Sequence, residues 1–365
     1  MIFATAVSNP LHTKLVKATF YPRYNKSKDV LTAFLPLKYL GSKRKLIPFL
    51  EKTIKSVVGN DLAKFSFCDL FAGTGIVGRH FKSSVKEIIS NDLEYYSFVI
   101  NRHTIGNNEI IPDSEYYIDV LNRLPLEQRG FIYKNYCPGG GSGRMYFSDH
   151  NGKKIDTMRQ WIEWIKKLGI DDDLYFFLLA SLIESADAVA NTTAHYTAYL
   201  KQLIPDAQKP LILEPAHSET TQNSHRVFNE NANDLIRKIS GDILYLDPPY
   251  TARQYGGDYH LIASIAKGDT FIPAGKTGRR PYQRSAWASS KSAESELDDL
   301  LKHAQFKYTF MSYNNEGLLT PATIKSIMSK YGKYDVASTE YKRFKSSAGV
   351  HKAATTTEFL HILEK

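Results

Sequence analysis

The sequence predicts an α/β fold built on an open, Rossmann-like sheet. A buried strand pattern at 65–71 runs directly into the glycine-rich turn 72–78. A second strand pattern at 87–92 ends in an acid, and a third at 243–246 ends in Asp247-Pro248-Pro249-Tyr250. In open α/β sheets, ligands bind beyond the carboxyl ends of the strands. These three polar ends therefore predict a ligand site along one edge of the sheet.

The bulk composition indicates a globular protein with a polyanionic partner. Of 365 residues, 42% are hydrophobic and 12% aromatic, and the length allows two domains or one large domain with an insertion. The net charge of +9 fits a nucleic acid. We find neither an apolar run of membrane-spanning length nor a signal sequence, which indicates a cytoplasmic protein. Cys68 and Cys137 form no CxxC pair, so neither a disulfide framework nor a metal site is predicted.

The stretch 37–48 carries a candidate anion site, whereas residues 1–30 remain unassigned. Its Gly-Ser turn, Gly41-Ser42, precedes a basic amphipathic segment. Backbone N–H groups of such a turn, together with Lys43, would suit an anion. A solvated helix start is the alternative interpretation.

The glycine-rich turn 72–78 has the context of a nucleotide-type site. Glycine allows the backbone to approach a ligand closely and to adopt positive φ. A strand precedes the turn and a helical pattern follows it. Asp92 follows Asp69 at close to the roughly 20-residue spacing from which an acid reaches ribose hydroxyls. An enzyme that binds a nicotinamide cofactor would share these features.

The turn at 247–250 suits an exocyclic amino group of a nucleobase. Its two prolines fix two φ angles, so the turn is stiff. The Asp247 carboxylate and the Pro248 carbonyl can accept from one amino group, with the Tyr250 ring as a stacking surface. An ordinary Pro-Pro turn at the end of a buried strand is the alternative.

Together these segments resemble the amino-methyltransferases that use S-adenosylmethionine. DPPY resembles their motif IV, DLFAGTGIVG their motif I, SNDLEYYS their motif II and KYLGSK their motif X. The order X, I, II, insertion, IV is that of their α group, and the chain is similar to its Dam-like and Fok-like adenine branch. The resemblance implies a catalytic turn of Asp247, Pro248, Pro249 and Tyr250. It implies cofactor contacts from Tyr39, Lys43, Asp69, Phe71, Gly73, Gly75 and Asp92, and from Asn231, which stands where the family commonly has an acid.

The region 113–227 differs in character and predicts an insertion between the cofactor half and the catalytic strand. Helical spacing runs from Ile155 to Leu168, and a mostly apolar helix from Asp172 to Asn191. The resemblance implies a mainly helical target-recognition region here. Residues 1–112 and 228–365 would then form the catalytic domain.

Several residues after the DPPY turn are candidates for DNA contact. Arg253 could bind a phosphate or a base edge, and Tyr255 and Tyr259 offer stacking faces. The loop 266–291 is strongly basic, which suits phosphate clamping, although a solvated charge run is the alternative. A strand is predicted at 306–314 and a hairpin from 334–342 and 356–362. The DNA-contact candidates are Arg253, Tyr255, Tyr259, Arg279, Arg280, Arg284 and Arg343.

The sequence thus predicts a site-specific DNA adenine-N6 methyltransferase that acts on a flipped-out base. S-adenosylmethionine would be the cofactor, double-stranded DNA the partner, and a separately encoded restriction endonuclease a further expected partner. Cytosine-N4 transfer, RNA or glutamine amino-methylation, and a non-catalytic DNA-binding protein on the same fold are the alternatives. The recognised DNA word, the number of strands modified and the oligomeric state do not follow from the sequence.

Overall fold

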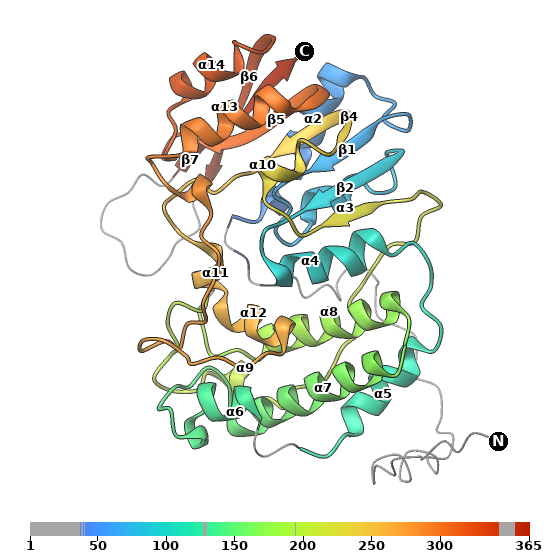
Figure 1. Cartoon of the computed structure of the whole chain (residues 1–365), viewed down its shortest axis with the longest axis vertical. Helices are drawn as coiled ribbons and strands as arrows, with labels where there is room; N and C mark the ends of the chain where they lie inside the picture. The colour runs from blue at the N-terminus through green and yellow to red at the C-terminus, as the bar shows by residue number, and fades with distance from the viewer. Residues whose placement is uncertain (1–36, 38, 40, 127–129, 194, 343–354) are drawn as a thin grey trace, which may run out of the picture. The chain divides into compact units, whose positions relative to one another are not determined.

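A seven-stranded sheet organises the residues that the structure describes (Figure 1). The computed structural model describes residues 37, 39, 41–126, 130–193, 195–342 and 355–365. The strand order is β3-β2-β1-β4-β5-β7-β6, and every pairing is parallel except those of β7. The strands are β1 (Ser66–Asp69), β2 (Glu87–Asn91), β3 (Arg226–Phe228), β4 (Ser240–Leu246), β5 (Gln305–Asn314), β6 (Lys333–Lys342) and β7 (Thr355–Glu364).

The sequence patterns predicted this sheet well, with one omission. The α/β class, the strands at 65–71, 87–92, 243–246 and 306–314, and the C-terminal hairpin are all confirmed. The omitted strand is β3, which has only three residues and lies at the sheet edge. Three residues are too few to carry a recognisable alternation.

Helices cover both faces of the sheet because successive strand residues point to opposite sides. Phe67, Ile88 and Ile243 pack with α2 (Ile47–Val58) and α3 (Ile76–Phe81). Their neighbours Cys68, Ile89 and Leu244 pack on the other face. That face is covered by α10 (Ala232–Leu235), α13 (Ala293–His303) and α14 (Pro321–Met328).

A third hydrophobic core joins the helices of the predicted insertion to helices outside it. Its longest members are α7 (Asp149–Lys167), which begins at a Ser148 cap, and α8 (Asp172–Ala188), which begins at an Asp171 cap. Helix α7 was predicted from its helical spacing and α8 from its mostly apolar composition. The remaining helices of this core are α4 (Tyr95–Asn101), α5 (Ser114–Arg123), α6 (Phe131–Tyr136), α11 (Tyr255–Asp258) and α12 (His260–Lys267), and the short α9 (Pro205–Gln208) also belongs to the segment 113–227.

The helical segment therefore does not have a core of its own. Helix α8 contacts both α4 and α12, which precede and follow the segment 113–227 in the chain. Residues 36–365 form one compact unit, in which this segment is included. Its role in recognising DNA stays a prediction.

One buried lysine ties together the two ends of this helical segment. The Lys82 ammonium is 1% exposed and donates to the carbonyls of Thr104 (3.0 Å), Asn107 (2.7 Å) and Glu219 (2.6 Å). Burial lowers the pKa of Lys82 to about 8. Lys82 therefore holds, at one point beside α3, the stretch where the chain enters the helical segment and the stretch where it leaves it.

In the part of the chain that is described, no helix combines the length and apolar character needed to cross a bilayer.

Candidate active site

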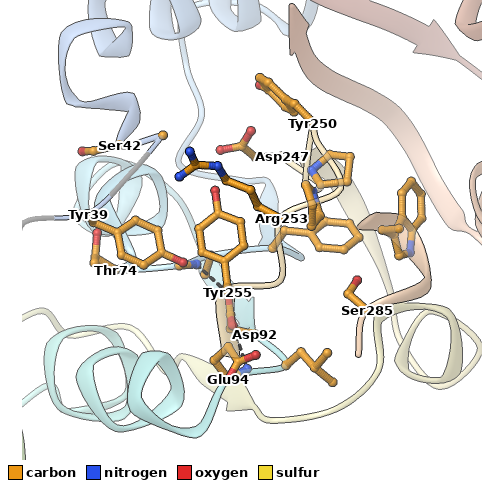
Figure 2. A pocket seen from close by; sticks show the side chains of 18 of the residues that line it. Tyr39, Ser42, Thr74, Asp92, Glu94, Asp247, Tyr250, Arg253, Tyr255 and Ser285 are labelled. Atoms are coloured by element: carbon orange, nitrogen blue, oxygen red, sulfur yellow. Dashed lines mark hydrogen bonds between the residues drawn. The ribbon is translucent and has the colours of Figure 1, made fainter. Parts of the chain in front are cut away.

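A pocket of about 580 Å³ opens at the carboxyl ends of β1, β2 and β4. Asp69, the last residue of β1, pairs with Ser90 of β2 and Tyr245 of β4. Asp92 and Asp247 lie two residues beyond those partners, so the register brings three carboxylates to one edge. In the view of Figure 2, Asp247 and Tyr250 lie at one end of the pocket and Asp92 at the other.

The glycine turn that follows the carboxyl end of β1 adopts conformations that only glycine takes readily. Gly73 has φ of 54° and Gly75 has φ of 75°. Asn101 of α4 secures this turn, because its side-chain amide donates to the Gly73 carbonyl at 2.9 Å. A Cβ on Gly75 would lie 2.2 Å from Asn101 Oδ1. No sequence pattern pointed to Asn101, which contacts the turn only through the tertiary fold.

Two carboxylates beside the turn are held in different ways. Asp92 accepts from the backbone N–H groups of Gly73 and Glu94, both at 2.8 Å. Asp69 is 1% exposed and accepts from the Gly78 N–H at 3.1 Å through one oxygen. Its other oxygen has no hydrogen-bond partner among the residues that the structure describes. A buried, unpartnered carboxylate oxygen in a pocket is ready to accept from a bound donor.

Burial raises the pKa of both carboxyl groups. The pKa of Asp69 rises to about 7 and that of Asp92 to about 6, in each case mainly because burial disfavours the charged form. The backbone donors partly oppose this rise. Both groups therefore change charge within the range where most enzymes work.

Aromatic side chains from two distant segments meet beside the turn. Phe71 and Trp287 are packed edge to face, with ring centroids 5.1 Å apart. Trp287 belongs to a short helical turn, η4 (Ala286–Ala288), and its indole N–H donates to Asn233 Oδ1 at 3.0 Å. Both rings line the pocket. The composition of the basic loop suggested phosphate contact and gave no indication that its end reaches this place.

Asn231, predicted at a cofactor position, lies in the pocket wall near these rings. Its side-chain oxygen accepts from the Asn233 N–H at 2.8 Å and caps α10. The side chain is thus already engaged in starting a helix.

The DPPY turn presents its acid and its ring to the same pocket. Lys43, at the start of η1 (Lys43–Lys45), lies 2.8 Å from Asp247 Oδ1 and 4.7 Å from the centre of the Tyr250 ring. The structure therefore places Lys43, which was predicted as a cofactor contact, in the pocket wall and beside the DPPY turn. The Tyr250 ring also packs against Tyr313 at 4.6 Å.

Of the two tyrosines predicted to stack on a base, the structure leaves one accessible. Tyr255 lines the pocket and stacks on Tyr39, with centroids 5.5 Å apart. Tyr259 is 0% exposed and lies inside the helical core, where it stacks on both Tyr39 at 4.9 Å and Tyr255 at 6.1 Å. Tyr259 therefore supports Tyr39 and offers no free face to a base.

The arginines that were predicted to contact DNA differ in their exposure. Arg253, Arg279 and Arg284 are exposed, and Arg253 lines the pocket. Arg280 is 7% exposed and makes a two-pronged contact with Asp269 at 3.0 and 2.8 Å. That geometry argues against a phosphate contact by Arg280. Arg343 lies outside the described residues.

Further residues of the pocket wall were not predicted from the sequence. Gln254 and Ser285 exchange two hydrogen bonds, at 2.8 and 3.2 Å, which joins the segment after DPPY to the end of the basic loop. Thr193 and His195 reach the pocket from the helical segment. Across the described ranges, no three His, Cys, Asp or Glu side chains are grouped so as to hold a metal ion.

The strand order with an antiparallel β7, the glycine turn after β1 and the DPPY turn after β4 define an amino-methyltransferase. Residues 39–327 match the family described as D12 class N6 adenine-specific DNA methyltransferase. The chain belongs to this family and is an adenine-specific DNA methyltransferase.

Relatives of known type support the same assignment. The chain is 52% identical to the Type II methyltransferase M.NlaIII of Neisseria lactamica, over 90% of this chain and 99% of that protein. It is 36% identical to the Type II methyltransferase M.CviAII of Paramecium bursaria Chlorella virus 1, over 84% and 92% of the two chains. It is 34% identical to the Type II methyltransferase M.FokI of Planomicrobium okeanokoites, over 90% of this chain but 53% of that protein.

Proposed function

We propose that the pocket binds S-adenosylmethionine and transfers its methyl group to the N6 amino group of an adenine swung out of duplex DNA. The observation that carries this proposal is the convergence of the glycine turn and the DPPY turn on one pocket. Bound there, the sulfonium compound supplies an electrophilic methyl group. The unpartnered Asp69 oxygen offers an acceptor for its amino group, and Asp92 for its ribose. Phe71 and Trp287 form an apolar wall for its adenine.

The protein's own residues would orient the target base. The Asp247 carboxylate and the Pro248 carbonyl accept from the two N6 hydrogens, and Tyr250 stacks on the ring. This geometry aims the N6 lone pair at the methyl carbon. Transfer would form the new N–C bond at the expense of the C–S bond, whose electron pair would stay on sulfur. The nitrogen, now positively charged, loses a proton to solvent. Such a transfer needs mainly positioning.

The exposed basic residues and the helical segment are the proposed DNA contacts. Arg253, Arg279 and Arg284 would contact phosphates, since exposed arginines bind them well. The segment 113–227 would read the target word, since its residues Thr193 and His195 reach the pocket where the base would enter. Because the relatives are named Type II methyltransferases, we further propose that this enzyme protects DNA from a separately encoded restriction endonuclease.

Transfer of a labelled methyl group tests the proposed reaction. Purified protein is incubated with labelled S-adenosylmethionine and mixed-sequence duplex DNA, and the product nucleosides are separated. Label in N6-methyladenine supports the proposal. Label in N4-methylcytosine would correct the base, and cofactor binding without label in DNA would overturn the reaction.

Trp287 provides a direct test of the cofactor position. Only three tryptophans occur, and Trp161 and Trp164 lie in the helical core rather than in the pocket wall. Addition of S-adenosylmethionine should therefore change the tryptophan emission through Trp287. In Trp287→Phe this change should vanish, and the Kd should rise about 5-fold, since aromatic contacts and a lost hydrogen bond amount to roughly 1 kcal/mol. Trp164→Phe is the control; a full emission change in Trp287→Phe would contradict the placement.

Cofactor affinity should depend on pH through Asp92. The pKa of this group is raised to about 6, so below that pH it mostly carries a proton and is a weaker acceptor for ribose hydroxyls. If binding requires the ionised form, the Kd should rise about 10-fold between pH 7.5 and pH 5, with protonation of Asp69 adding to the effect. Calorimetric titration at several pH values measures this. Asp92→Asn should bind weakly and lose the step near pH 6; an unchanged step would contradict the assignment.

A further inference from the structure

A carboxylate on the last strand reaches the DPPY turn from the far end of the chain. Glu358 of β7 is 4% exposed, and its Oε1 accepts from the Tyr250 hydroxyl at 2.8 Å. The same oxygen lies 3.8 Å from the Lys43 ammonium. Lys43 in turn lies 2.8 Å from Asp247. One carboxylate therefore touches the ring residue directly and reaches the acid through a single lysine.

Lys43 and Glu358 are both buried, so each charge depends on the other groups of the arrangement as partners. Lys43 and Glu358 are 5% and 4% exposed, and a buried charge is tolerated only with a partner. Burial raises the pKa of Glu358, and the Lys43 ammonium opposes that rise. In such a low-dielectric setting, removing one charge leaves the others poorly compensated, so the contacts hold one another in place.

Two contacts of the Tyr250 side chain and one of its main chain hold this residue, and Glu358 accepts from the hydroxyl, the only polar atom of the side chain. Tyr313 packs against the ring at 4.6 Å. The Tyr250 carbonyl accepts from the Leu318 N–H at 2.9 Å. The Tyr313 contact is made by the ring and the Leu318 bond by the main chain, whereas the bond to Glu358 fixes the position of the hydroxyl end of the ring. Glu358 itself is fixed by strand pairing with Asn314, which also lines the pocket.

We infer that Glu358 is a positioning residue for methyl transfer, holding Tyr250 by its hydroxyl and Asp247 through Lys43. This inference rests on the proposed function. The two groups that flank the target base are set at a fixed separation by one side chain. A misplacement of about 1 Å at a reacting centre costs roughly 100-fold in rate. Loss of Glu358 should therefore reduce turnover much more than cofactor binding.

The test compares Glu358→Ala, Glu358→Gln and Tyr250→Phe in single-turnover transfer to a DNA substrate that the wild type methylates. Glu358→Ala should lower the rate about 10- to 100-fold, with the Kd for S-adenosylmethionine within about 3-fold of the wild type. Glu358→Gln should recover part of the rate, because its amide oxygen still accepts from the Tyr250 hydroxyl. Tyr250→Phe keeps the ring but removes that hydroxyl, and should also lower the rate.

The combined variant separates positioning from a general loss of stability. Glu358→Ala with Tyr250→Phe should be little slower than Glu358→Ala alone, because both changes break the same contact. Glu340→Ala, an exposed carboxylate on the adjacent strand β6, is the matched control and should leave the rate unchanged. Melting temperatures confirm that each variant is folded.

The outcomes distinguish this inference from the proposed function. Wild-type transfer combined with an unchanged rate in Glu358→Ala overturns the positioning role and leaves the function standing. The positioning role is also overturned if the combined variant loses rate by the product of the two single-variant losses. An absence of transfer by the wild type overturns the proposed function, and the inference falls with it.

Discussion

Replacing Asp247 with alanine is expected to abolish methyl transfer while S-adenosylmethionine still binds. Asp247 lies beyond the end of β4 and supplies the acceptor proposed for the adenine amino group. Its removal takes away the group that aims N6, and such positioning accounts for most of the proposed catalysis. The proposed cofactor contacts come instead from the glycine turn and the carboxylates beside it. A loss of at least about 1,000-fold in rate is expected.

The measurement pairs single-turnover transfer with calorimetric cofactor binding. Asp247→Ala leaves the buried Lys43 without its 2.8 Å partner, so a lower melting temperature is expected as well. Asp247→Asn keeps an acceptor oxygen at the same place and should retain measurable transfer. Turnover in Asp247→Ala near that of the wild type would refute the mechanism.

Gly75→Ala should abolish cofactor binding by displacing the side chain that secures the glycine turn. The new Cβ would lie 2.2 Å from Asn101 Oδ1. Asn101 holds the Gly73 carbonyl at 2.9 Å and the Ser97 carbonyl at 2.7 Å, so it cannot move without releasing the turn. The change also forces alanine into a left-handed conformation, at a cost of about 1 kcal/mol. A Kd higher by 100-fold or more is expected, on the order of 3 kcal/mol.

Gly59→Ala provides the control for backbone strain. Gly59 has φ of 107°, and a Cβ there would meet nothing within 4 Å. It lies at the end of α2, outside the pocket wall. This variant should therefore lose some stability but bind the cofactor normally. Equal binding defects in the two variants would show that strain alone, rather than Asn101, is responsible.

The parts of the site that could be predicted are those in which one short segment carries the whole signal. The glycine turn is indicated by the strand pattern before it. The DPPY turn is indicated by two prolines that follow an apolar run. Asn101, Trp287 and Glu358 have no such local signature. Trp287 lines the pocket, whereas Asn101 and Glu358 contact the two turns that line it, and all three contacts arise only in the tertiary fold.

Local composition also fails where burial decides whether a side chain is available. Tyr259 and Arg280 have the residue types that DNA contacts use, and each stands in a suitable stretch. In the fold, Tyr259 packs inside the helical core and Arg280 is engaged by Asp269. Asn231 likewise has the position of a cofactor contact but caps a helix. Sequence reveals what a side chain can do, whereas the packing determines which of its options remain.

The lysine that joins both ends of the helical segment bears on how this proposed recognition region could be exchanged between related enzymes. Lys82 binds main-chain carbonyls only, so the anchor does not depend on the side chains at either end. A transplanted segment spanning 108–218 would keep the same attachment point. Helices α4 and α12 would then both face a foreign partner, because they pack on α8 from outside that range. Functional chimeras are therefore expected when the residues of α4 and α12 that contact α8 are carried over together with 108–218.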